Sequence, residues 1–202
     1  MTASRKPAYH HGDLRGALMR TALLLIEQHG VQGLALSDAA RLSGVSVAAP
    51  YRHFKDKEAL LADIATEGFA LFRNALARAM ESHPGDGVKR LVEMGVAYVE
   101  FALDHPSHFK VMWEGVVPKD KYPQLRQAAH QAYLLLQQAV LDLLPKSSPA
   151  RQQALIVAAW SIAHGYATLA LGRELEVVTK QKIDKKLLRQ SLHLLVDQFA
   201  AD

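Results

Sequence analysis

The chain has 202 residues, of which 50% are apolar and 22% are charged, a composition typical of a globular protein. It has no cysteine, which excludes disulfides, thiol nucleophiles and cysteine-ligated zinc sites. No uncharged apolar run reaches the roughly 18 residues that a membrane span needs, and the first residues lack the apolar core of a signal peptide. We therefore expect a cytoplasmic protein that does not enter a membrane.

The net charge of +4 is concentrated near the N-terminus. Residues 1–60 hold eight Lys and Arg against five Asp and Glu, an excess of three, whereas residues 61–202 hold 16 against 15, an excess of one. Four of the ten histidines also lie in the first part. A basic portion beside a near-neutral remainder favours a polyanion-binding module attached to a neutral body.

The first two predicted helices are short and well delimited. Apolar residues at helical spacing predict a helix over 14–28, with Asp13 as its N-cap and Gly30 as its stop. A second helix is expected over 37–42, stopped by the dipeptide Ser43-Gly44.

A third short helix is expected in the stretch VSVAAPYRHF, residues 45–54. With Ser46 as N-cap, Pro50 is the fourth helical residue, where the cost of a proline falls below the roughly 3 kcal/mol of a helix interior. Pro50 also disfavours the α conformation at Ala49, so the helix can instead begin one or two residues later.

The remaining pattern predicts longer helices. Asp56 is expected to cap the first of them, and Ser148-Pro149 is a strong start signal of a later one. No region alternates with period two for long enough to require a sheet. We predict an all-α fold of about nine helices, the later six covering 56–81, 86–104, 107–114, 122–144, 150–172 and 185–200. The helices over 86–104 and 150–172 are apolar on nearly all sides, which predicts burial in a bundle.

Two short helices around a glycine turn, packed on a longer helix, form a helix-turn-helix arrangement. Gly44 can adopt a positive φ in the turn Ser43-Gly44-Val45. The second short helix would enter the major groove of DNA, where side chains reach base edges. The alternative is that YRHF is only the end of an amphipathic helix, with Phe54 in the core and its polar neighbours solvated. We expect residues 1–55 to form this domain and residues 56–202 to form a helical ligand-sensing and dimerisation domain.

From Tyr9 to about Phe69 the sequence resembles the N-terminal domain of the TetR/AcrR family of transcriptional regulators. The resemblance rests on the segments YHHGDLRGALMRTALLLIEQHG, LSDAARLSGVS and APYRHFKDKEALL. It implies a homodimer that places two helices on a palindromic DNA operator. It further implies that a small, largely apolar ligand binds the dimer and releases it from the DNA. We expect a repressor, with activation as the alternative, and we expect no cofactor, no metal and no enzymatic activity.

Carried over residue by residue, the resemblance gives a set of candidate DNA contacts. Arg52 is the best candidate for reading a base, while Tyr51, His53 and Lys57 suit phosphates. Ser37 replaces a frequently basic residue of the family, although it can cap the second helix and donate to a phosphate. The full set is Ser37, Ser46, Ala48, Ala49, Tyr51, Arg52, His53 and Lys57.

A weaker resemblance lies in AWSIAHGYATL, where Trp160, His164 and Gly165 resemble the Trp-His-Gly signature of one C-terminal class of the family. Trp160 and His164 are four residues apart and so share a helix face. They are either core residues or part of a cavity wall in which His164 anchors a ligand. The candidate ligand-binding residues are Phe69, Phe72, Tyr98, Phe101, Met112, Trp113, Tyr133, Trp160 and His164.

The dimer is expected to form through the helices 150–172 and 185–200, as a four-helix bundle with their symmetry mates. The first is rich in small residues, and the second has an apolar stripe that includes Leu188, Leu192, Leu195 and Phe199. Alternatively, both helices only close the core of one protomer.

Two other classes of protein compete with this interpretation. An enzyme is disfavoured because GxSxG, HExxH, Walker A and GxGxxG motifs are all absent. His105 and His108, three residues apart near Asp104, leave a metal site conceivable. A helical structural or small-molecule-binding protein without DNA function is the main alternative.

Overall fold

The computed structural model describes residues 13–115, 117–180 and 184–200. Within these ranges the secondary structure is entirely helical, with nine α-helices and two 3₁₀-helices. In chain order the elements are α1 (Leu14–His29), α2 (Leu36–Leu42), η1 (Ala49–Arg52), α3 (Lys57–Glu81), α4 (Gly87–Asp104), α5 (Pro106–Trp113), η2 (Lys119–Lys121), α6 (Pro123–Leu143), α7 (Pro149–Leu171), α8 (Glu174–Thr179) and α9 (Lys185–Ala200). The predicted all-α fold is confirmed.

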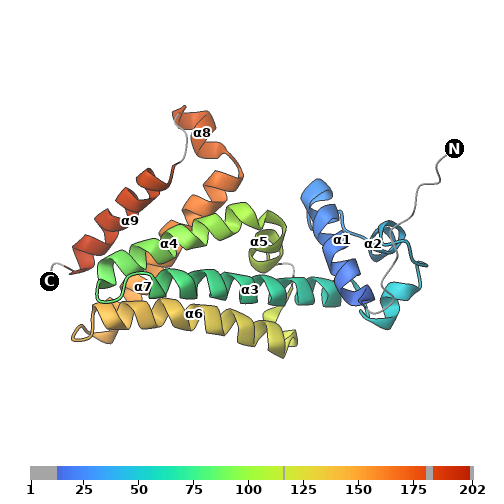
Figure 1. Cartoon of the computed structure of the whole chain (residues 1–202), viewed down its shortest axis with the longest axis horizontal. Helices are drawn as coiled ribbons and strands as arrows, with labels where there is room; N and C mark the ends of the chain where they lie inside the picture. The colour runs from blue at the N-terminus through green and yellow to red at the C-terminus, as the bar shows by residue number, and fades with distance from the viewer. Residues whose placement is uncertain (1–12, 116, 181–183, 201–202) are drawn as a thin grey trace.

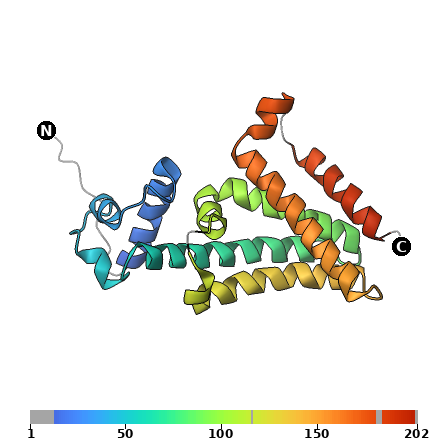
Figure 2. The ribbon, with the colours of Figure 1, turned by 180° about the vertical axis from the view of Figure 1, so that it is seen from behind.

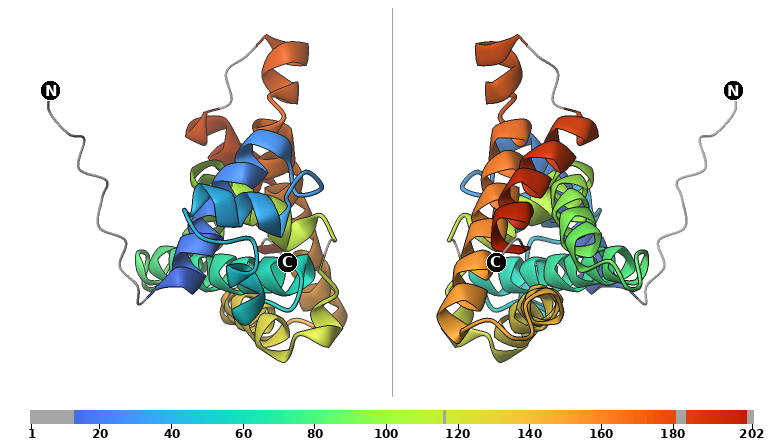
Figure 3. Two further views of the ribbon diagram at one scale, coloured as in Figure 1. Left: turned by 90° about the vertical axis from the view of Figure 1, so that its right-hand side faces the viewer. Right: turned by 90° about the vertical axis from the view of Figure 1, so that its left-hand side faces the viewer.

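The long helix α3 connects two parts of the molecule (Figure 1). Its first turns lie beside α1, α2 and η1, which form a small unit at one end. The rest of α3 extends along α6 and packs against α4, α5 and α6 in the larger helical body (Figures 1 and 2). End-on views show α8 projecting from this body, beyond α7 and α9 (Figure 3).

Three of the helix starts follow the predicted capping residues. The Gly16 N–H donates to Asp13 Oδ1 over 3.0 Å, and the Ala59 N–H donates to Asp56 Oδ1 over 2.8 Å. The Ser148 hydroxyl accepts from the Arg151 N–H at the start of α7. Each bond satisfies a backbone donor that a helix leaves free in its first turn, so these caps fix where the chain enters each helix.

The N-terminal unit has its own small core. Leu18, Ala22, Ile26 and Ala39 are fully buried there, which joins α1 to α2. Gly44 follows α2 with φ +71°, as predicted, and no atom lies within 4 Å of the position where a Cβ would stand. The tight turn at Gly44 redirects the chain from α2 toward η1.

The predicted third α-helix is replaced by the 3₁₀-helix η1, which begins after Ala48. The start is two residues later than the N-cap at Ser46 requires and matches the later start expected from Pro50. An α-helix would need an N–H at Pro50 to reach the Ser46 carbonyl, and proline has none. Instead, the Ala49 N–H donates to the Ser46 carbonyl and the His53 N–H to the Pro50 carbonyl, each over 2.9 Å.

The body is organised around α4, which packs against α3, α5, α6, α7 and α9. This agrees with the burial predicted for a helix that is apolar on nearly all sides. The short helix α8 was not predicted, because its segment follows Arg173 as a polar stretch without a clear apolar period.

The helix α7 bears on the expectation that the chain does not enter a membrane. Among the described residues, it is the one helix that is long and apolar enough to cross a membrane, and its most apolar stretch of 18 residues has a mean hydropathy of 1.6. In this fold, 28% of that stretch is buried inside the protein. Its polar residues interrupt the apolar run without lowering the average enough. In this fold α7 packs against α4, α6, α8 and α9.

Candidate DNA-binding surface and ligand cavity

Residues 46–53, which we call the reading segment, expose most of their side chains. Tyr51 is 59% exposed, and Arg52 and His53 are exposed beside it. Within the described ranges, none of these three side chains makes a hydrogen bond or an ion pair. The buried residue of η1 is Pro50, and Phe54 is buried just after it. The segment is therefore held from below while its polar groups remain free to bind another molecule.

The smaller candidates for DNA contact lie around the same surface. Ser46 and Ala48 are exposed and Ala49 is half-buried. Ser37 is half-buried and is the second residue of α2. The N-cap of α2 is Ala35, without a side-chain hydrogen bond, so the expectation that Ser37 caps this helix is wrong. Leu36 already belongs to the helix, so Ser37 lies two residues after the N-cap position.

Lys57 opens α3, as predicted, but its ammonium group already has a partner. Lys57 Nζ donates to the Gln32 carbonyl over 3.0 Å and thereby ties the loop after α1 to the start of α3. An ammonium group has three donors, so this bond leaves two of them for a further acceptor.

Most other cations of this end have acidic partners. Arg15 pairs with Asp63, Arg20 with Asp13 at 3.2 Å, and Arg41 with Asp38 at 2.9 Å. Their positive charges are partly compensated inside the protein. Arg52 has no such partner among the described residues, which makes it the strongest free cation of the reading segment.

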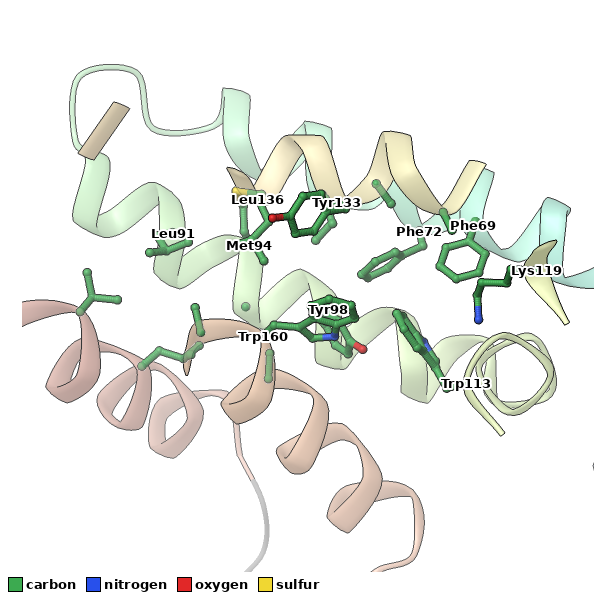
Figure 4. A pocket seen from close by; sticks show the side chains of 18 residues that line it. Phe69, Phe72, Leu91, Met94, Tyr98, Trp113, Lys119, Tyr133, Leu136 and Trp160 are labelled. Atoms are coloured by element: carbon green, nitrogen blue, oxygen red, sulfur yellow. The ribbon is translucent and has the colours of Figure 1, made fainter. Parts of the chain in front are cut away.

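The body contains a cavity of about 310 Å³ between α3, α4, α6, α7 and α9, which we call the cavity (Figure 4). Its walls are almost entirely apolar. Six of the nine predicted ligand-binding residues line it, namely Phe69, Phe72, Tyr98, Trp113, Tyr133 and Trp160. The volume is at the lower end of the range of about 300–1,000 Å³ found for small-molecule sites.

The other three predicted residues are not part of the cavity wall. Phe101 and Met112 are buried, and they pack in the core next to the lining residues. His164 stands behind Tyr98 and shares a hydrogen bond of 2.8 Å with its hydroxyl. Trp160 and His164 therefore differ in position, because only Trp160 reaches the cavity.

Burial keeps both groups of this hydrogen bond neutral. It raises the pKa of Tyr98 far above its usual value near 10 and lowers the pKa of His164 from its usual value near 6.5. The His164 ring stacks on Phe109 at a centroid distance of 5.5 Å and meets Trp113 edge-on at 5.4 Å. The histidine thus positions the hydroxyl of a tyrosine that lines the cavity.

Sequence reasoning missed several lining residues, of which Lys119 is the most informative. Its Nζ lies 5.8 Å from the ring centroids of both Phe69 and Trp113 and donates to the Met112 carbonyl over 3.2 Å. Lys119 lies in a connecting segment with no helical period, so no sequence pattern indicates that it turns inward. The other missed lining residues are Leu76, Leu91, Gly95, Ala129, Ala132, Leu136, Ala159, Ala163, Leu192 and Val196, and Met94 also lines the cavity.

The segment that carries Lys119 also contacts the start of α3. The Tyr122 hydroxyl donates to Glu58 Oε1 over 2.9 Å, and Lys121 Nζ lies 3.8 Å from the same oxygen. Partial burial and the Glu58 carboxylate raise the pKa of Tyr122 to about 12. A second contact joins the body to α1, because the Ser107 hydroxyl donates to the Leu23 carbonyl over 3.0 Å.

The histidines considered as metal ligands lie at the start of α5. His108 is 8% exposed, and its Nε2 lies 3.6 Å from Glu67 Oε2, beyond the usual length of a hydrogen bond. Over the residues that the structure describes, no group of three or more His, Asp or Glu side chains could hold a metal ion.

Comparison with known proteins identifies the family. The family described as "Bacterial regulatory proteins, tetR family" matches residues 18–64, and the "Tetracyclin repressor-like, C-terminal domain" matches residues 91–198, more than half of the chain. The curated relative "Uncharacterized HTH-type transcriptional regulator YobS" of Bacillus subtilis (strain 168) is 24% identical over 93 residues. This match covers 46% of the chain and 48% of YobS, so the chain spans about half the length of that relative.

Two solved structures match nearly the whole chain. A protein of unknown function from Rhodococcus sp. RHA1 is 31% identical with a TM-score of 0.78, covering 97% of this chain and 98% of that one. A TetR-family transcriptional regulator from Bordetella parapertussis 12822 is 19% identical with a TM-score of 0.60, covering 93% of this chain and 96% of that one, and shares the fold. From the two family matches and the arrangement of its helices, the chain belongs to the TetR family of transcriptional regulators.

Proposed function

We propose that this protein is a dimeric transcriptional repressor that binds a palindromic operator and leaves it when a small, largely apolar molecule enters the cavity. The observation that carries the DNA-binding role is the reading segment, whose exposed Tyr51, Arg52 and His53 have no partners in the described part of the protein. The role places the protein in the cytoplasm, where bacterial DNA is found. Residues 1–55 would serve DNA binding, and residues 56–202 sensing and dimerisation.

The DNA contacts divide by chemistry. Arg52 is proposed to read a base edge or a phosphate, and Tyr51, His53 and Lys57 to bind phosphates. Ser37 and Ser46 would add hydroxyl contacts, whereas the small side chains of Ala48 and Ala49 would allow close approach to the groove. Because the segment has few groups able to make paired contacts with bases, we expect phosphate contacts and DNA shape to contribute much of the affinity.

A homodimer through α7 and α9 is supported by apolar side chains that these helices expose. Val157 on α7 is 52% exposed and Leu194 on α9 is 73% exposed. The stripe expected to form the α9 interface mostly closes the protomer instead, since Leu188 and Leu192 are buried against α4. The proposed interface therefore uses the opposite face of α9, with Leu187 and Leu194.

The second step of the mechanism, release by a ligand, is supported by the cavity and its position. The cavity is lined by Phe69 and Phe72 of α3, the helix whose first turn carries Lys57. A ligand that favours a different position of this wall would bias the orientation of the N-terminal unit. We also propose, from Trp160, His164 and Gly165, that the body of this protein belongs to the Trp-His-Gly class of C-terminal domains.

The experiment that tests the DNA-binding role is selection from random double-stranded DNA with the purified protein, followed by titration of the enriched sequence at several salt concentrations. We expect a palindromic consensus. Replacing Arg52 by Gln or Lys57 by Ala should weaken binding and reduce the slope of log affinity against log salt by about one. Arg126→Gln, at an exposed site on α6, is the control and should leave both unchanged.

Failure to enrich any sequence would contradict the proposal and favour a helical small-molecule-binding protein without DNA function. Unchanged salt slopes in both Arg52→Gln and Lys57→Ala would contradict the assigned contacts only.

A further inference from the structure

The cavity contains one charged side chain. Lys119 is the single Lys or Arg among the lining residues that the structure describes, and none of them is acidic. Its described neighbours are neutral, namely the Met112 carbonyl and the faces of Phe69 and Trp113. A cation in apolar surroundings is costly unless an anion or several acceptors compensate it. The ammonium group thus has unused capacity for a negatively charged partner.

A second donor without an acceptor lies beside this lysine. Trp113 Nε1 is buried and has no hydrogen-bond partner in the described protein. Buried polar groups are nearly always satisfied, so an orphan indole N–H on a residue of the cavity wall indicates an acceptor that reaches it when the wall adjusts to a ligand. Lys119 Nζ lies 5.8 Å from the centroid of the Trp113 ring, which places both donors at the same end of the cavity (Figure 4).

The opposite end of the cavity has no charged lining residue, and its one labelled polar group is the Tyr133 hydroxyl beside Met94 and Leu136 (Figure 4). Leu91, Met94 and Leu136 lie away from Lys119 in Figure 4, and all three side chains are apolar. Along α3 the lining extends from Phe69 to Leu76, a helix rise of about 10 Å. The cavity is therefore polarised, with the one cation at one end and about 10 Å of mostly apolar wall beyond it.

Lysine and tryptophan side chains donate hydrogen bonds and accept none. A ligand that satisfies both must present acceptor oxygens, and the positive charge of Lys119 favours an acceptor that is anionic. Charge-assisted hydrogen bonds of this kind are about twice as strong as those between neutral groups. A carboxylate meets these conditions with two acceptor oxygens on one compact group.

We propose that the ligand of this cavity is a small amphiphilic carboxylate, whose anionic head is bound by Lys119 and Trp113 and whose apolar body lies along Phe72, Leu76 and Met94. This assignment names the ligand class of the proposed function. Its biological meaning rests on that function, but the binding itself does not require DNA.

The cavity offers a direct optical test, because both tryptophans of the chain, Trp113 and Trp160, line it. Titration of the full-length protein with octanoate, decanoate and dodecanoate should change the tryptophan fluorescence and saturate. The matched primary alcohols should bind at least about tenfold more weakly, since they lack the charge. Naphthoate forms a second arm that distinguishes an aromatic from an aliphatic body.

The variant Lys119→Gln should weaken carboxylate binding by about tenfold or more and leave alcohol binding nearly unchanged. Alcohol binding then also shows that the cavity is intact. Lys119→Arg should restore most of the carboxylate affinity, because the charge returns. Trp113→Phe should weaken carboxylates in the same direction, with Trp160 left as the reporter. The control is Lys89→Gln, which removes a charge at an exposed site near the other end of the cavity.

Three results would overturn the inference: no saturable binding of any carboxylate, equal affinity for acids and alcohols, or an unchanged acid affinity in Lys119→Gln. The DNA selection separates this failure from failure of the proposed function. Charge-dependent binding of carboxylates without an enriched DNA sequence would contradict the proposed regulatory function and support the proposed ligand class. An enriched sequence without acid binding would do the reverse.

Discussion

His108 lies in α5 with its ring buried against the middle of α3, and its environment affects the stability of the body. Burial lowers its pKa below the usual value near 6.5, although the Glu67 carboxylate 3.6 Å away acts in the opposite direction. The neighbouring His105 ring, at a centroid distance of 5.8 Å, also disfavours the charged form. His108 is therefore neutral in the folded protein at neutral pH.

This environment predicts a pH dependence of stability. Below pH 6.5 the unfolded chain binds a proton at His108 that the folded protein takes up only at lower pH, so protons favour unfolding. The stabilisation is complete above about pH 6.5 and is lost as the pH falls below that value. The free energy of unfolding, measured by urea denaturation at pH 7.5 and 5.5, should fall less in His108→Gln than in the wild type.

His130→Gln, at an exposed site on α6, serves as the matched control and should keep the pH dependence of the wild type. An identical fall in the wild type and His108→Gln would show that His108 does not contribute.

The aromatic residues of the cavity were predictable from the sequence, and their polar neighbours were not. Helical spacing marks Phe69, Phe72 and Tyr98 as inward-facing, since apolar side chains of a bundle point to its interior. The same rule does not distinguish the cavity wall from the core behind it. For this reason Phe101 and Met112 were predicted as lining residues although they are buried in the core. Lys119 lies outside any periodic segment, so its inward direction depends on tertiary packing alone.

Among the elements, η2 and the start of α3 form one connection between the cavity and the DNA-binding end. Lys119 lines the cavity, and Tyr122, three residues later, is hydrogen-bonded to Glu58 in the first turn of α3. Lys55 Nζ, just after the reading segment, lies 5.9 Å from the centroid of the Tyr122 ring. A ligand that moves Lys119 would therefore pull on the residues that position Lys57.

We expect Tyr122→Phe to uncouple the two sites. The lost hydrogen bond should change the separate affinities for DNA and for ligand by less than about threefold, since a typical bond contributes about 1 kcal/mol. The loss of DNA affinity caused by saturating ligand, typically about 5- to 150-fold in coupled systems, should become smaller. Fluorescence anisotropy of labelled operator DNA, with and without ligand, measures this ratio.

Tyr166→Phe removes a hydroxyl that donates to the Asp184 carbonyl in the far part of the body, and it should preserve the full response. If Tyr122→Phe responds to ligand as strongly as the wild type, the connection through η2 is not the coupling route.

The elements were predictable where their ends carry a local signal. Asp13, Asp56 and Ser148 cap their helices through side-chain hydrogen bonds that need no tertiary context. The form of η1 was foreseeable only in part, because Pro50 forbids one hydrogen bond but does not select which turn replaces it. The role of the α9 stripe was not, because period alone does not tell whether the partner of an apolar face is the same chain or a second copy.

Dimerisation determines how the two reading segments meet the DNA. Two half-sites of a palindrome lie about 34–36 Å apart, so one protomer can occupy only one of them. The exposed face of α7 includes Val157, Ser161 and Gly165, which follow one another at intervals of four residues. A Cβ at Gly165 would have no neighbour within 4 Å inside the protomer, so this position offers room for a close helix from a second copy.

Gly165→Leu should therefore leave the protomer folded and weaken the dimer. Alanine is about 0.8–1 kcal/mol more favourable than glycine in a helix and leucine ranks just below alanine, and a Cβ here meets no atom of its own protomer within 4 Å. Sedimentation velocity should show a shift toward monomer and a parallel loss of affinity for the full operator. Gln127→Leu, which adds the same side chain at an exposed site on α6, should stay dimeric. A wild-type dimer in Gly165→Leu would place the interface elsewhere.

The exposure of the reading segment has a consequence for protein engineering. Ser46, Val47 and Ala48 are exposed, and the turn beneath them is held by Pro50, Phe54 and main-chain hydrogen bonds. Substitutions at these three positions should thus have little effect on folding, whereas most substitutions in a protein destabilise it. A library varied there would sample new operator sequences on an unaltered sensor, so this chain offers a scaffold for retargeted genetic switches.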